Sequence, residues 1–87
     1  MSNNHKFRKA RTRTLIQIGG LVEKSGLLDR LSISLGQDLQ RDNALRDEVL
    51  VLLGALSSLE EEMGRGDYSR NLWKERGISI IKEKDWQ

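Results

Sequence analysis

One apolar stripe in the second half of the chain constrains the fold more than any other feature. Its members alternate steps of three and four residues, the spacing of one face of an α-helix: Leu45, Val49, Leu52, Leu56, Leu59 and Met63. The pattern predicts a helix over about residues 38–63, capped by Asp38 or Asp42 and ended by Gly64. The stripe is longer than an 87-residue chain easily covers, so we expect its first five members to form an interface.

Three further segments predict helices, which makes the chain all-α. The first starts at Arg8 and ends near Lys24, with Gly26 in the left-handed conformation after it. A short helix is predicted over residues 27–33, although Leu31, Ile33 and Leu35 fit strand alternation equally well before a turn at Gly36. A last helix covers residues 70–76; Ser69 caps it and Gly77 ends it.

Two glycines interrupt the first of these helices. Gly19 and Gly20 each cost about 1 kcal/mol relative to alanine inside a helix. Either another helix approaches the backbone closely there, or the chain breaks into two short helices with a turn. We favour one continuous helix, because the apolar spacing continues on both sides of the pair.

The length and the pattern predict one small domain. A chain of 87 residues holds one hydrophobic core at most. We predict a flexible arm over residues 1–7, a single helical domain over residues 8–81 and a loose tail over residues 82–87. Trp73 is expected to anchor the core, and Trp86 is either exposed or docked on a partner. The expected architecture is a small bundle of three to four helices with a basic N-terminal arm.

Charge is distributed unevenly along the chain. Residues 1–22 contain five cations and no acid, a net charge of +5: Lys6, Arg8, Lys9, Arg11 and Arg13. Residues 23–87 contain ten basic and thirteen acidic residues, a net of −3, and the two parts sum to the overall +2. We predict that the five cations bind phosphates of a nucleic acid, helped by Thr12 and Thr14. The alternatives are a solubilising tail, or contact with a protein or a membrane.

Several classes of function are excluded or disfavoured. The chain has no cysteine and one histidine, His5, so neither a thiolate metal site nor an oriented general base is expected. No phosphate-binding glycine loop of the NTPase or dinucleotide type occurs. We expect neither a catalytic site nor a metal or cofactor. No apolar run approaches the ~20 residues of a membrane helix, and no secretory signal is present, so we expect a cytoplasmic protein.

Three blocks of sequence resemble a known family. The string RKARTRTLIQIGGLVEKSGLLD at the start, LLGAL at residues 52–56 and WKERG at residues 73–77 follow the order seen in the small conjugal transfer TraD family, over about residues 8–81. The SISLGQDLQRDN and GRGDYSR segments depart from its pattern. The family is distinct from the large coupling ATPase of the same name.

The resemblance implies a role in DNA processing for bacterial conjugal transfer, in a setting like that of relaxosome accessory proteins. It carries over no catalytic residue, and its matching basic positions are those we place on DNA: Arg8, Lys9, Arg11 and Arg13. We therefore predict a non-catalytic accessory protein that binds DNA and forms a dimer. A relaxase is a candidate partner. The alternative is a helical adaptor that regulates a relaxase or another transfer component without touching DNA.

Overall fold

A computed structural model describes the backbone of residues 2–84 and the side chains of residues 6–83. Within this part the chain folds into four α-helices and one 3-10 helix: α1 (Ser2–Lys24), α2 (Leu27–Arg30), η1 (Asn43–Leu45), α3 (Arg46–Arg65) and α4 (Arg70–Lys84). The predicted all-α class and the small helical bundle are confirmed. No strand forms among the described residues, so the strand alternative for residues 31–35 is wrong.

Helix α1 runs without a break through Gly19 and Gly20, as we favoured. A Cβ atom placed on either glycine would meet nothing within 4 Å, so no described part of the chain packs closely against the backbone there. Gly26 follows α1 with a φ of 84°, which confirms its predicted left-handed conformation. The helix already begins at Ser2, before the predicted start at Arg8. The division into arm, domain and tail stays a prediction.

Two predicted helix ends are wrong, and both involve glycine. Gly64 lies inside α3, which ends at Gly66 with a φ of 77°; the Gly66 N–H donates to the Met63 carbonyl at 3.1 Å. Gly77 lies inside α4, which continues to Lys84. Glycine ends a helix only where its backbone turns left-handed, and composition alone does not show where this happens.

The segment before α3 is a structured loop rather than helix. The Asp38 carboxylate accepts hydrogen bonds from the N–H groups of Gln40 and Arg41, both at 3.1 Å, and so closes a turn. The Asp42 carboxylate accepts from the Ala44 N–H at 3.0 Å and caps η1. Both aspartates therefore cap a turn, as anticipated, but the α-helix starts at Arg46 instead of residue 38.

The short helix α2 ends at Arg30, three residues before its predicted end. Ser32 takes a positive φ of 58°, which the α-helix does not allow, and Gly36 turns the chain with a φ of 96°. Ser69 caps α4 as predicted, because its hydroxyl oxygen accepts from the Leu72 N–H at 3.2 Å.

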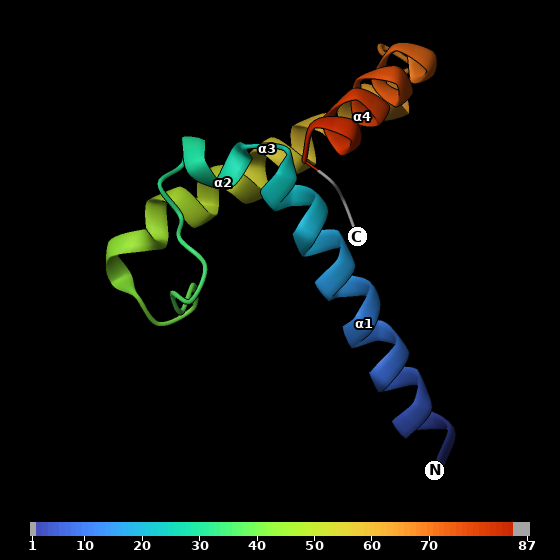
Figure 1. Ribbon diagram of the computed structural model, residues 1–87. Coiled ribbons are helices and arrows are strands. Elements are labelled where there is room, and N and C mark those ends of the chain that lie inside the picture. The colour runs from blue at the N-terminus through green and yellow to red at the C-terminus, as the bar shows by residue number, and fades with distance from the viewer. Residues whose placement is uncertain (1, 85–87) are drawn as a thin grey trace.

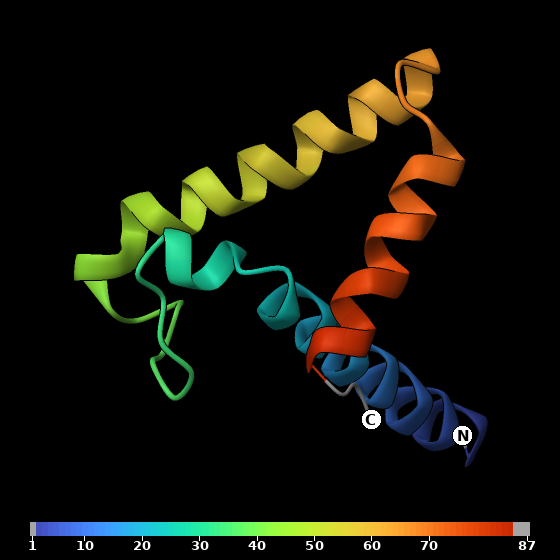
Figure 2. The same cartoon turned by 45° about the horizontal axis from the view of Figure 1, so that its top comes forward.

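The bundle is open. Helix α1 packs against α2 and α4, and η1 packs against the start of α3, but α3 lies against neither α1 nor α4. Figure 2 shows α3 and α4 diverging from the turn that joins them, and the far end of α4 returning to α1. Among the described residues only Ile33 (5% exposed) and Leu45 (7% exposed) form a buried apolar core.

Candidate nucleic-acid interface

The N-terminal half of α1 projects away from the rest of the molecule (Figure 1). Every residue from Lys6 to Gly19 is exposed. The contacts that hold α1 lie near its other end, where Leu21, Lys24 and Ser25 line a small cavity together with residues of α4. The five cations predicted from sequence therefore lie on a helix that is accessible from every side.

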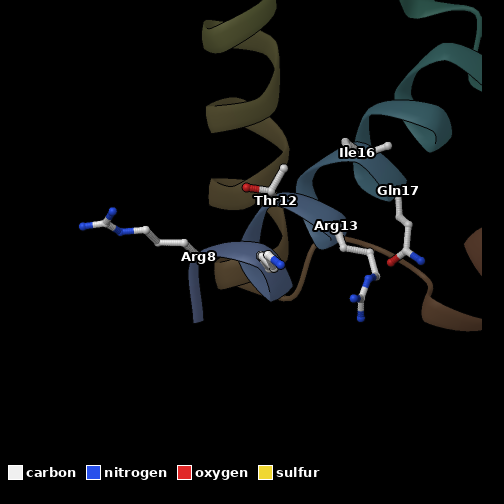
Figure 3. A pocket seen from close by; sticks show the side chains of 6 residues that line it. Arg8, Thr12, Arg13, Ile16 and Gln17 are labelled. Carbon is white, nitrogen blue, oxygen red and sulfur yellow. The ribbon is translucent and has the colours of Figure 1, made fainter. Parts of the chain in front are cut away.

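The cations occupy two faces of α1. At 100° per residue, Lys6, Lys9 and Arg13 fall within about 60° of one another. Arg8 and Arg11 lie on the opposite side, beside Leu15. In Figure 3, Arg8 extends to one side of the helix while Arg13 points to another. The structure thus brings three of the cations to one face and leaves two apart.

No carboxylate neutralises these cations within the described residues. The ion pairs there are Arg41 with Asp38 at 3.9 Å, and Arg65 with Glu61 at 4.0 Å and with Asp67 at 2.9 Å. All lie outside α1. The first acid of α1 is Glu23, which is about 15 Å along the axis from Arg13 at 1.5 Å per residue. The positive field of the projecting half of α1, which we call the arm from here on, is therefore uncompensated.

The two threonines differ in what they offer a phosphate. The Thr14 hydroxyl donates to the Ala10 carbonyl at 3.1 Å, so its one O–H is already in use. Thr12 instead shares a shallow surface depression with basic, polar and apolar neighbours (Figure 3): Arg8, Lys9, Arg13, Ile16 and Gln17. Of the two, Thr12 is the better placed phosphate donor.

The dimensions of α1 suit a duplex. A helix with its side chains is about 10–12 Å wide, and the major groove of B-DNA is about 12 Å wide. The basic residues of one face would meet phosphates at the groove edge. Phosphate contacts fix position without reading sequence.

The predicted interface residues, which lie at the end of η1 and along α3, divide into a covered group and an exposed group. Leu45 is buried, and Val49 and Leu52 are half-buried. Leu56 and Leu59 are 42% and 43% exposed. The same stripe continues to exposed Met63, and α4 adds exposed apolar residues that sequence reasoning had not assigned to an interface: Leu72 and Ile78.

Trp73 does not anchor the core as predicted. It is 42% exposed, because the first turns of α4 pack against no other helix. Its ring contacts that of Tyr68, with centroids 4.9 Å apart. Trp86 lies outside the described residues, as does the side chain of His5.

Within the described residues, no group of three histidine or acidic side chains is arranged to hold a metal ion. No helix there combines the length and the apolar character needed to cross a bilayer.

Comparison with known sequences yields one match. The sequence model of a family described as conjugal transfer protein TraD matches residues 5–83, nearly the whole chain. No curated protein and no solved structure gives a significant match.

Proposed function

The chain belongs to the conjugal transfer protein TraD family, and we propose that it serves conjugal transfer as a non-catalytic accessory protein that binds DNA and helps to assemble the relaxosome. The uncompensated arm cations support this role most directly. Five cations lie on the projecting half of α1, and none has a carboxylate within 4.0 Å among the described residues. Binding a polyanion releases its counterions, which favours the complex.

The arm also holds cations that repel one another. Lys9 and Arg13 are four residues apart on one face of α1, a spacing at which like charges destabilise a helix. A phosphate bound beside this face relieves the repulsion. The proposed setting is the bacterial cytoplasm, with DNA near a transfer origin, a relaxase and a second copy of the chain as partners.

The salt dependence of DNA binding tests the proposal. We expect the full chain to bind a duplex carrying the transfer origin, with an affinity that falls steeply as salt rises. Replacing Arg8, Arg11 and Arg13 by alanine should reduce the log–log salt slope by about 0.9 for each lost phosphate contact. An affinity unchanged by the triple substitution would remove DNA from the role of the arm.

A matched control separates the arm from net charge. Replacing Arg46, Arg70 and Arg76 by alanine removes the same three charges from exposed positions on α3 and α4. Under the proposal this variant keeps the slope of the parent within about one unit. Equal losses in the two variants would mean that the overall charge, and not α1, attracts DNA.

A second candidate function is an adaptor that regulates a relaxase without touching DNA. The exposure of Leu56 and Leu59 favours it, because a monomer gains nothing from apolar residues in water. The adaptor predicts that a relaxase is still captured after deletion of residues 1–13, and that a gel shows no shift of DNA. Loss of capture on that deletion would favour the DNA-binding role.

A further inference from the structure

The single chain exposes more surface than a compact protein of its mass. Its accessible surface is 7783 Å², whereas a folded monomer of 10.0 kDa exposes about 5,200 Å². Its radius of gyration is 15.6 Å, against about 12 Å for a compact domain of this length. Roughly 2,500 Å² per chain is therefore available for burial.

Helix α3 is one of the uncovered elements. It has 20 residues, yet within the described part of the chain no other α-helix packs along it, and only near its start does Leu52 share an apolar cavity with residues of α1 and α2. Helices in proteins owe most of their stability to the packing of an apolar face. Its apolar seam, which we define as Leu52, Leu56, Leu59 and Met63, is half-buried at Leu52 and exposed at the other three positions.

The spacing of the seam is the same in both directions. The steps from Leu52 to Met63 are four, three and four residues. A second α3 running antiparallel therefore presents the same pattern: Leu52 meets Met63 of the second copy, and Leu56 meets its Leu59. A two-fold dimer requires this reciprocity, because the same patch must contact itself.

We infer that the seam of α3 binds a second copy of this chain with the two α3 helices antiparallel. The excess surface leaves room for this occupant. It amounts to about 5,000 Å² over two chains, whereas a specific interface of standard size buries about 1,600 Å² in total, so the projecting half of α1 can stay exposed in the dimer. The dimer deepens the proposed function, since a dimer carries two basic arms, but its formation does not require DNA.

The oligomeric state tests the dimer directly. Light scattering on the full chain without DNA should give twice the 10.0 kDa mass of one chain. Leu59→Glu places a charge in the seam and should raise the dissociation constant of the dimer at least about 100-fold. Leu50→Glu is the matched control: Leu50 is 54% exposed on the same helix, roughly opposite the seam, and its substitution should leave the mass unchanged.

Cross-linking keeps the test decisive if Leu59→Glu does not fold. The chain has no cysteine, so Leu56→Cys introduces a single thiol. In the antiparallel register the two thiols lie about 4.5 Å apart along the axis and should form an intermolecular disulfide on mild oxidation. Leu50→Cys should not.

Two outcomes would overturn the dimer. One is a single-chain mass at every concentration tested, which would leave the seam to a different partner. The other is a dimer that survives Leu59→Glu, or that cross-links through position 50 instead of position 56. Replacing Arg8, Arg11 and Arg13 by alanine should leave the mass at that of the dimer, so a failure of DNA binding and a failure of dimerisation are told apart.

Discussion

Helices α1 and α3 are the longest in the molecule, and both are largely exposed, but they expose opposite chemistry. The projecting half of α1 presents uncompensated cations. The second half of α3 presents uncovered leucines. Exposed charge is well solvated, so a ligand bound to α1 would serve function and not stability. Exposed leucine is unfavourable in water, so a partner bound to α3 would also stabilise the chain.

The difference separates residues that hold the chain together from residues that let it act. Substitutions in the apolar stripe should change the free energy of unfolding. Substitutions among the arm cations should change binding while leaving stability nearly untouched.

The largest effect is expected at the buried end of the stripe. Leu45→Ala removes one of the two apolar side chains that are buried in the described part of the chain, and should lower the free energy of unfolding by about 2–5 kcal/mol. Leu50→Ala, at an exposed position of the adjoining helix α3, should lower it by less than about 0.5 kcal/mol. Urea unfolding followed by circular dichroism at one protein concentration measures both. Equal losses of stability in the two variants would mean that burial does not determine how much each apolar residue contributes.

The next effect is the dependence of stability on protein concentration. If α3 is covered by a second copy, each tenfold dilution should cost about 1.4 kcal/mol of apparent stability and lower the Tm. In Leu59→Glu this dependence should vanish. If the Tm of the unsubstituted chain does not depend on protein concentration, α3 is not covered by a second copy. It would then resemble the projecting half of α1, which is stable without a partner.

A smaller gain is expected at the glycine pair. Gly19→Ala should stabilise α1 by about 0.5–1 kcal/mol, because the added Cβ meets nothing within 4 Å and glycine is a poor helix residue. Gly26→Ala should instead destabilise, since its φ of 84° strains any side chain. Thermal unfolding distinguishes the two. A destabilising Gly19→Ala would reveal a partner helix pressed against α1.

The smallest effect on stability is expected in the arm. Replacing Arg8, Arg11 and Arg13 by alanine should change the free energy of unfolding by no more than about 0.5 kcal/mol. Any change should be favourable, since alanine is the best helix former and the substitutions remove repulsion between neighbouring cations. A loss of several kcal/mol would show that these side chains pack, which would erase the contrast with α3.

Local signals in the sequence were enough to predict much of this fold. The helix through Gly19 and Gly20, the left-handed Gly26 and the cap at Ser69 follow from spacing and residue type. Features that depend on distant contacts were not predictable. Helix α4 continues beyond Gly77, where it meets α1. The residues next to Gly77 in the sequence do not indicate this contact, so the continuation of the helix could not be predicted.

The candidate site divides in the same way. The arm cations could be placed on two helix faces from their spacing alone. The lack of nearby acids could be read from the sequence of residues 1–22. The graded burial of the stripe could not, because its regular spacing does not show that Leu45 is buried while Leu56 and Leu59 stay exposed. Interface residues predicted from one stripe therefore split between core and surface.

The unbroken course of α1 makes the arm a lever. From Ile16 to Ser2 the helix extends about 21 Å beyond the region where α2 and α4 hold it. A tilt of roughly 10° at that base would move the tip by about 4 Å, close to the 3.4 Å that each nucleotide of a strand advances along the axis of a DNA duplex. A small change in packing around the base of α1 is thus enough to move the arm by one nucleotide step.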